Sequence, residues 1–372
     1  MQERLSRQSP WGRSRQLIML HNMRFLWGFD AVAPTERLPS GPLTAVAAAL
    51  RCPRALTALL SAATLFLGLP GAVPAFAGQE EPLRAGGKPI LALPTGGKPS
   101  GNAAASVHAD DADTEHIFGF SMGSDIGRTG EVELEMENVG AFGKRDGSYA
   151  TLATLNQVKY TLTDRFRIAP GFAIGAQRID SVAGFDDRHH VSFNGATMEF
   201  RYKLVDRATA PFGLTLHAQP GWSWVDDASG RRVEQYGGEF AALFDRELVT
   251  DRWFAAFNVW YATGVTRELA TGLSAHDSEF ALHGALSYQI EPGLVVGVGT
   301  RYLRSYAGGG LDRLAGEAVY VGPTFSYNLT HTLGLSGTWQ VQVAGRAIGD
   351  GRRFNLDHFE RHQAMLRINA HF

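Results

Sequence analysis

The last twelve residues of the chain, 361–372, alternate between apolar and polar side chains and stop on an aromatic ring. Counting back from Phe372 in steps of two reaches Ile368, Leu366 and Ala364, whereas the interleaved positions are mostly polar or charged. Successive side chains of a β-strand point to opposite faces, so the stretch predicts a strand with one apolar and one polar face. Such a closing strand suits a membrane barrel, whose outer face meets lipid and whose inner face is polar.

The same alternation recurs along the chain from residue 131 to its end. It predicts twelve strands, at 131–143, 148–162, 165–179, 192–204, 211–225, 232–248, 252–265, 277–290, 294–304, 315–329, 332–344 and 357–372. Long strands at near-regular spacing are typical of a tilted membrane-crossing barrel rather than of a sandwich of short strands. The predicted fold is therefore an all-β, transmembrane antiparallel β-barrel of about twelve strands, with ten or fourteen as alternatives.

Charged residues decide which face of these strands points inward. In the first predicted strand, Val132 and Leu134 alternate with Glu131, Glu133 and Glu135. A charge facing lipid near the bilayer midplane costs about 2–4 kcal/mol, so the charged face is predicted to line the lumen. A soluble two-sheet sandwich would show the same alternation with its apolar face in a core, and it is the alternative fold.

The connections between the predicted strands also alternate in length. Most of the connections at 163–164, 205–210, 249–251, 291–293 and 330–331 are tight, whereas those at 180–191, 226–231, 266–276, 305–314 and 345–356 are longer. Short turns on one side and long loops on the other are typical of outer-membrane barrels, with the long loops extracellular. An even number of strands then places both ends of the barrel on the periplasmic side.

The first part of the chain has the layout of an export leader. Arg51 and Arg54 precede an apolar stretch at 55–69, which leads to the small-residue site at 75–77. This order is typical of a secretory signal peptide. Residues 1–77 are therefore predicted to be a leader, with the signal peptide at 51–77 and surplus sequence before it. Residues 78–114, rich in Gly, Ala and Pro, are predicted to be a disordered periplasmic linker, and 115–372 the barrel.

Cysteine content and charge exclude several classes of function. The single cysteine, Cys52, lies in the predicted leader, so the exported chain has no disulfide, thiolate metal site or thiol nucleophile. Residues 1–77 hold eight Arg and three acids, which leaves 35 − 8 = 27 basic and 37 − 3 = 34 acidic residues, a net charge of −7. A mildly acidic chain without a basic block is not expected to bind nucleic acid.

Two motifs resemble those of an uncharacterised family of proteobacterial outer-membrane β-barrels. The first is the Phe-Gly-aromatic block at Phe118–Phe120, followed by Asp125 and an acidic first strand. The second is the terminal Phe372, which resembles the C-terminal assembly signal of such barrels. The resemblance implies a location in the cell outer membrane of a Gram-negative bacterium. The expected partners are outer-membrane lipid, lipopolysaccharide and the barrel-assembly machinery, which would read the strand ending at Phe372.

Charged and polar side chains of both signs fall on the inward positions. The lumen-lining candidates are Glu131, Glu133, Glu135, Glu199, Arg201, Lys203, His217, Glu279, His283, Arg301, Arg361 and Arg367. A polar lumen predicts a passive, narrow, porin-like pore for small polar solutes, whose facing charges select among them. The alternative is a closed lumen braced by Glu–Arg pairs, in a structural or surface-recognition barrel. Arg361 and Arg367 are expected to pair with acids of the first strand.

Catalysis and metal binding receive little support from the sequence. His283 and Ser287 share a strand face but lie roughly 13 Å apart, too far for direct proton transfer. A membrane-embedded lipid hydrolase with a His–Ser pair on neighbouring strands is the less favoured alternative. The run Asp186–His190 is interpreted as solvated loop charge, because its neighbouring side chains diverge and Arg188 opposes a cation. We expect no catalytic residue, metal or cofactor.

Overall fold

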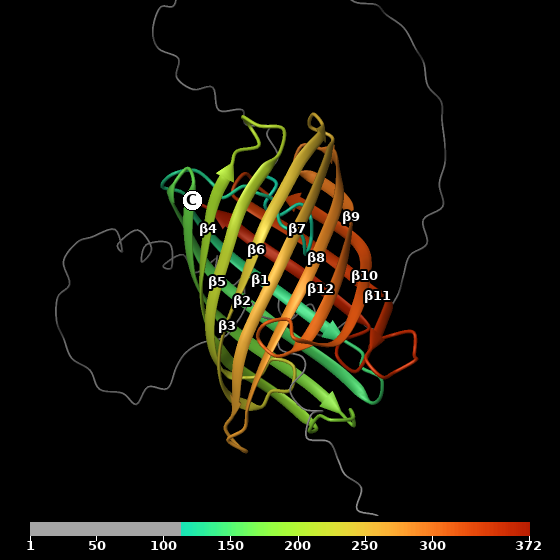
Figure 1. The fold of residues 1–372 in the computed structure, drawn as a ribbon. Coiled ribbons are helices and arrows are strands. Elements are labelled where there is room, and N and C mark those ends of the chain that lie inside the picture. Colours follow the sequence, from blue (N-terminus) through green and yellow to red (C-terminus); the bar gives the residue numbers. More distant parts are fainter. Residues whose placement is uncertain (1–112) are drawn as a thin grey trace, which may run out of the picture. The chain divides into compact units, whose positions relative to one another are not determined.

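Residues 113–372, the part of the chain described by this computed structural model, form a closed barrel of twelve antiparallel strands (Figure 1). Each strand pairs with its neighbours in sequence, and β1 pairs with β12. The strands are β1 (Val132–Phe142), β2 (Ser148–Thr163), β3 (Phe166–Asp180), β4 (Arg188–Val205), β5 (Gly213–Val225), β6 (Arg232–Val249), β7 (Trp253–Glu268), β8 (Ser274–Glu291), β9 (Leu294–Ala307), β10 (Arg313–Asn328), β11 (Leu333–Ala347) and β12 (His362–His371). The predicted fold class and strand number are confirmed.

The seam between β1 and β12 closes the barrel. Their register pairs Glu133 with His371 and Phe142 with His362. The backbone amide of Phe372 donates to the carbonyl of Val132 at 2.8 Å, so the last residue of the chain completes this ladder. Because both edges of the sheet are used in this seam, no strand edge is left open.

The antiparallel order gives the barrel two distinct ends. The end at which β1 begins and β12 stops, here called the closing end, carries the turns 164–165, 206–212, 250–252, 292–293 and 329–332. The opposite loop end carries 143–147, 181–187, 226–231, 269–273, 308–312 and 348–361. The predicted long loop at 180–191 is shorter than expected, because β4 begins at Arg188, and the connection 206–212 is as long as 181–187.

The two faces of the wall differ in chemistry. Exposed apolar side chains lie on alternate positions of successive strands, as with Phe240 on β6 and Phe257 on β7, each 47% exposed. The interleaved positions carry buried polar and charged groups such as Lys159, Arg201 and Arg367. This is the reverse of the distribution in a soluble domain, where charged side chains are almost never fully buried unless they are paired.

Among residues 113–372, no helix is long and apolar enough to cross a membrane.

The predicted last strand began too early. Residues 357–361 were expected to be part of it, but β12 starts at His362. The preceding residues leave the sheet because Phe359 packs into a buried apolar cluster and the carbonyl of Glu360 accepts a hydrogen bond from Tyr320. Burial of an aromatic ring and a satisfied carbonyl therefore outweigh continuation of the strand.

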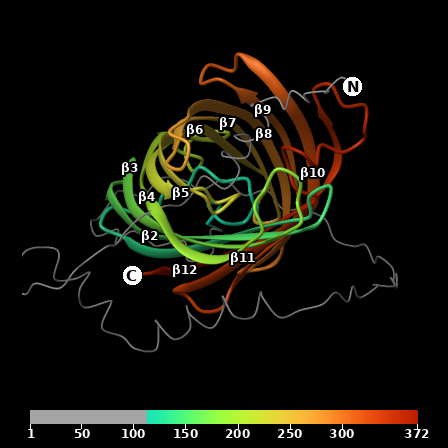
Figure 2. The ribbon, with the colours of Figure 1, turned by 90° about the horizontal axis from the view of Figure 1, so that it is seen from below.

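The predicted leader and nearly all of the predicted linker, residues 1–112, lie outside the described residues. The segment that follows them is the second departure from expectation. Residues 114–126, here called the plug, form no strand and are mostly buried. Figure 2 shows this teal segment within the ring of strands. The barrel therefore encloses a piece of its own chain.

Candidate functional site

The plug is a compact loop whose two ends lie side by side. Thr114 donates from its backbone amide and its hydroxyl to Asp125 Oδ2, at 3.2 and 2.9 Å. Arg207, in the turn between β4 and β5, donates to the same oxygen at 3.0 Å. Since residues 127–131 lead directly into β1, the plug is attached to the wall at the closing end of the barrel.

Apolar side chains of the plug fill three separate clusters inside the barrel. Ile117 and Phe118 pack with Phe254 on β7 and Val295 on β9. Met122 packs in a cluster with residues of β6 to β10, and Phe120 lies against a third cluster near β1 to β3. Because one short loop contacts strands on nearly all sides of the barrel, it fills the lumen at this level.

Backbone polar groups of the plug are matched by inward side chains of the wall. The Asn258 amide accepts from the Met122 backbone N–H at 2.7 Å and donates to the Met122 carbonyl at 2.8 Å. Ser287 Oγ donates to the carbonyl of Ile117 at 2.9 Å. These contacts satisfy groups that would otherwise be costly to bury.

Ser124, near the end of the plug that leads into β1, is held closely against β5 and β6. Ser124 Oγ donates to Asp245 Oδ1 at 2.5 Å, and the Ser124 carbonyl accepts from Thr215 Oγ1 at 2.5 Å. A Cβ placed on Gly213 would lie only 1.9 Å from Ser124 Oγ. Glycine is therefore required at 213 for the plug to reach this position.

Glu115 is the electrostatic anchor of the plug. Its carboxylate lies 2.5 Å from Arg167 Nη1, 2.8 Å from Lys159 Nζ and 3.0 Å from Arg201 Nη1. Burial alone would raise the pKa of Glu115, but Arg167, Lys159 and Arg201 hold it well below its usual range. One carboxylate of the plug is thus shared by three cations from β2, β3 and β4.

Wall carboxylates pair with the same cations. Lys159 Nζ lies 2.7 Å from Glu135, and Arg167 Nη2 lies 3.0 Å from Glu199, which Arg201 Nε also approaches at 3.2 Å. Together with the plug, these groups form the charge cluster. Its members from the wall are the acids Glu133, Glu135, Glu137 and Glu199 and the bases Lys159, Arg167, Arg201 and Arg367. The wall alone therefore contributes four negative and four positive charges.

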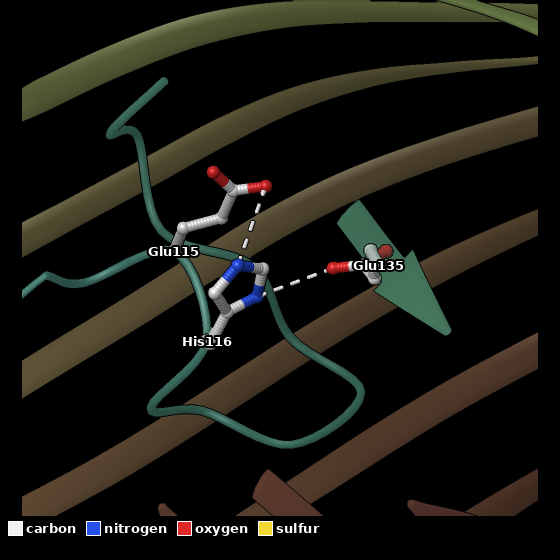
Figure 3. Close-up of side chains that lie close together, drawn as sticks. All are labelled: Glu115, His116 and Glu135. Atoms are coloured by element: carbon white, nitrogen blue, oxygen red, sulfur yellow. Dashed lines mark ion pairs between the residues drawn. The ribbon is translucent and has the colours of Figure 1, made fainter. Parts of the chain in front are cut away.

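Glu115, His116 and Glu135 bring ligand-type atoms within 4.8 Å of one another (Figure 3). Such a group could in principle hold a metal ion. Lys159 Nζ, however, lies within 2.8 Å of both Glu115 and Glu135, where an ion would have to sit. Because the ammonium already supplies the positive charge, the trio is better described as part of the charge cluster than as a metal centre.

Two loops fold inward at the loop end. In 226–231, the Ala228 carbonyl accepts from Tyr149 Oη at 3.0 Å, and the Asp227 carbonyl accepts from Gln177 at 3.2 Å. In 348–361, Glu360 pairs with Lys144 at 2.7 Å, both side chains being buried. The lumen is therefore filled by the plug and narrowed at the loop end.

Residues 110–372 match the model of a protein family described as a family of unknown function, DUF6662. The chain belongs to this family. No curated protein matches the chain. This family member is similar to the crystal structure of the COG4313 outer membrane channel from Pseudomonas putida F1, with a TM-score of 0.47 and 12% identity over 67% of this chain and 98% of that one.

Two further solved structures resemble this family member more distantly. The NanC porin gives a TM-score of 0.36 at 12% identity, over 64% of this chain and 98% of that one. The KdgM porin in complex with disordered oligogalacturonate gives a TM-score of 0.33 at 10% identity, over 65% of this chain and 99% of that one.

The structure brings some of the predicted lumen residues together and separates others. Buried within the barrel of this family member are Glu133, Glu135, Glu199, Arg201, His217, Glu279, Arg301 and Arg367. Half-buried are Glu131 and His371, which pair at 2.8 Å at the closing end, and Lys203, near the end of β4. His283 is half-buried as well, and its Nδ1 lies 3.3 Å from the carbonyl of Phe120.

The expected pairing of the closing-strand arginines with β1 holds for only one of them. Arg367 contacts Glu135 at 3.3 Å, and it also contacts Glu137, which was not among the candidates. Arg361, by contrast, precedes β12 at the loop end, where it donates to the carbonyl of Gln342 and lies over the Phe354 ring. Arg361 belongs to the segment 357–361, which lies outside the sheet, so the predicted pairing of Arg361 with β1 is wrong.

His283 and Ser287, considered above as a catalytic pair, each contact the plug backbone instead of one another. Sequence reasoning missed the plug itself, above all Glu115. It also missed Glu137, Lys159, Arg167 and Glu239. These four residues could have been predicted from the sequence, because each lies on an inward position of a predicted strand. No such signal existed for the plug, which has no period.

Proposed function

We propose that this chain is an outer-membrane channel for small polar solutes and that the plug is its gate. The observation that carries the proposal is the charge balance of the wall. With the plug removed, four acids still face four bases, and each of these bases already contacts at least one of these acids. The wall therefore retains its pairing when Glu115 withdraws, as a gate requires.

The polar character of the plug's attachment also supports a reversible gate. A buried ion pair gains little net free energy, because the Coulomb attraction is offset by the loss of hydration. Water entering behind a departing plug would rehydrate Glu115 and its three cations. Attachment by ion pairs and backbone hydrogen bonds is therefore easier to reverse than burial of a purely apolar plug of the same size.

The location in the outer membrane is supported by the exposed apolar face of the wall. In this proposal, both ends of the barrel are periplasmic and the loop end is extracellular. Residues such as Phe240 and Phe257 then contact lipid. Outer-membrane lipid and lipopolysaccharide cover this apolar face, which would otherwise be exposed to water. The strand ending at Phe372, which completes the seam with β1, would be the element read by the assembly machinery.

The lumen-lining residues of the proposed channel are those buried or half-buried on inward positions. They are Glu131, Glu133, Glu135, Glu199, Arg201, Lys203, His217, Glu279, His283, Arg301 and Arg367. A lumen lined by both signs of charge and narrowed by two loops favours small polar solutes over large or apolar ones.

A second candidate function is a closed structural or surface-recognition barrel. The inward folding of 226–231 and 348–361 supports it, because these loops are tied down by buried contacts of their own. In this case the charge cluster braces the wall permanently and the plug never leaves.

A reversible lock on the plug distinguishes the two candidates. Ser124 and Asp245 are in direct side-chain contact, so the pair Ser124→Cys and Asp245→Cys places two thiols where a disulfide can form. We expect the oxidised variant to be silent in planar bilayers and the reduced variant to conduct as the parent chain does. A parent chain that never conducts, at any voltage, would contradict the channel and favour the closed barrel.

The matched control carries Ser124→Cys alone. It cannot form the lock, so its conductance should not respond to oxidant. A response in this control would mean that oxidation acts elsewhere, and a conducting oxidised double variant would show that solutes bypass the plug.

A further inference from the structure

Two glutamates lie on one hydrogen-bonded row of the wall, on either side of a small residue. Glu239 on β6 pairs with Ala262 on β7, which in turn pairs with Glu279 on β8. Both glutamates occupy inward positions. With strands about 4.8 Å apart, their Cα atoms are roughly 10 Å from one another, and the residue between them carries only a methyl side chain.

The row lies beyond the plug, toward the loop end. The next inward row on the closing-end side is Ala241, Trp260 and Ala281, which packs in the same cluster as Met122 of the plug. Glu239, Ala262 and Glu279 are each one inward position nearer the loop end than these three residues. The two carboxylates therefore face the lumen directly beside the plug.

These two carboxylates differ from the acids of the charge cluster, because no cation of residues 113–372 forms an ion pair with them. Glu239 and Glu279 are each 8% exposed, and within residues 113–372 neither makes a hydrogen bond or an ion pair. Arg301 on β9 attracts Glu279 without forming an ion pair with it, and its guanidinium donates to the neutral amides of Gln340 at 2.7 Å and Gln363 at 2.6 Å. One guanidinium does not balance two ionised carboxylates, which are costly to bury unless a further positive charge joins them.

The cost of burying these two carboxylates is removed if a divalent cation binds between them.

We infer that Glu239 and Glu279 form a binding site for a hydrated divalent cation, Mg²⁺ or Ca²⁺, on the loop-end side of the plug. Two facing carboxylates match a charge of +2. The separation of their strands suits an ion that keeps part of its water shell, as Mg²⁺ does when it is held by one or two carboxylates. This inference deepens the proposed function and rests on it for its meaning, since an acidic site in the solute path favours cations over anions.

Binding can be measured without any conduction. The refolded full chain, in detergent free of lipopolysaccharide, is titrated with Mn²⁺ while the electron paramagnetic resonance signal of the free ion is followed. We expect the parent chain to take up Mn²⁺, and Mg²⁺ or Ca²⁺ to displace it. Glu239→Gln and Glu279→Gln should each weaken this uptake tenfold or more. Glu291→Gln, at the exposed end of the same strand as Glu279, should leave it unchanged.

A second variant tests the same site while keeping both glutamates. Ala262→Lys places an ammonium between them, so it should abolish Mn²⁺ uptake. Neutralising two unpaired buried acids should also raise the unfolding midpoint of Glu239→Gln and Glu279→Gln in metal-free buffer. Added Mg²⁺ should raise the midpoint of the parent chain alone, because a ligand of the folded state stabilises it.

Uptake that survives Glu239→Gln, Glu279→Gln and Ala262→Lys would overturn the inference, as would loss of uptake on Glu135→Gln alone, which would place the ion in the charge cluster. Failure of the proposed channel gives a different combination of Mn²⁺ binding and conductance. A chain that binds Mn²⁺ through these glutamates but never conducts refutes the channel and keeps the site, whereas a chain that conducts without binding does the reverse.

Discussion

Arg167 Nη1 lies 2.5 Å from Glu115 Oε2, so a residue that precedes the first strand is held by the third. Lys159 on β2 and Arg201 on β4 share the same carboxylate. Three neighbouring strands thus converge on one plug residue. Disturbing this residue should therefore release the plug without opening the sheet.

Glu115→Gln should free the plug while the barrel stays folded. Removing one partner of a buried ion pair costs about 3–5 kcal/mol, which predicts that hydrogen exchange at 117–124 accelerates by about two orders of magnitude or more. Strand amides of the wall should keep their protection. Glu234→Gln is the control, because Glu234 makes an exposed pair with Arg267 at 3.9 Å. Unchanged exchange in Glu115→Gln would show that the apolar contacts alone hold the plug.

Arg367 and Glu137 should behave as a coupled pair across the seam. Arg367→Met leaves Glu137 buried without its main cation and should destabilise the barrel by about 3–5 kcal/mol in urea unfolding. Adding Glu137→Leu removes the stranded carboxylate and should restore most of the loss. If the two substitutions are simply additive, the pair contributes nothing to the closing of the seam.

The outer face should show a dependence on depth in the bilayer. Phe240 lies near the middle of β6 and Leu248 near its closing end, and both are exposed. Phe240→Arg should cost about 2–4 kcal/mol in unfolding from lipid bilayers, whereas Leu248→Arg should cost about 0–1 kcal/mol. Equal costs at the two positions would argue against a membrane around this wall.

The loop 348–361 should loosen in acid. Arg145 donates to Asp357 at 2.8 Å, and this hydrogen bond lowers the pKa of the Asp357 carboxyl. A lowered pKa in the folded state means that the stabilisation is present above the ordinary carboxyl pKa of about 3.9 and is lost as the pH falls through the lowered value. A spin label at Gly351→Cys, where an added Cβ meets nothing within 4 Å, should therefore become more mobile below about pH 4.

The comparison for that measurement is Asp357→Asn, which removes the charge at every pH. Its label should be mobile throughout, with no transition in acid. A transition that persists in Asp357→Asn would assign the effect to another carboxyl, such as Asp350, which pairs with Arg145 at 3.4 Å.

The fold could be predicted from the sequence because its signal is local. Alternation with a period of two identified all twelve strands, and most predicted boundaries lie within three residues of the observed ones. It fails where a segment leaves the sheet, as at 357–361, since Phe359 is apolar whether it faces lipid or packs inside. Alternation alone cannot distinguish an aromatic residue that faces lipid from one that packs inside the barrel.

The site could be predicted only in part, for a related reason. Inward charges follow from alternation, which is why Glu133, Glu135 and Glu199 were candidates. Their partners across the lumen depend on which strands face one another after closure. The plug has no period, and Glu115 looks like linker charge until Lys159, Arg167 and Arg201 surround it.

The closed seam also makes the place of the plug depend on the end of the chain. Contacts of the plug come from both halves of the chain, from Lys159 on β2 to Arg367 on β12, which reaches His116 at 3.4 Å. These side chains surround a common space only after Phe372 has joined Val132. The plug is translated before any strand, but its complete set of contacts exists only once the last strand has closed the barrel.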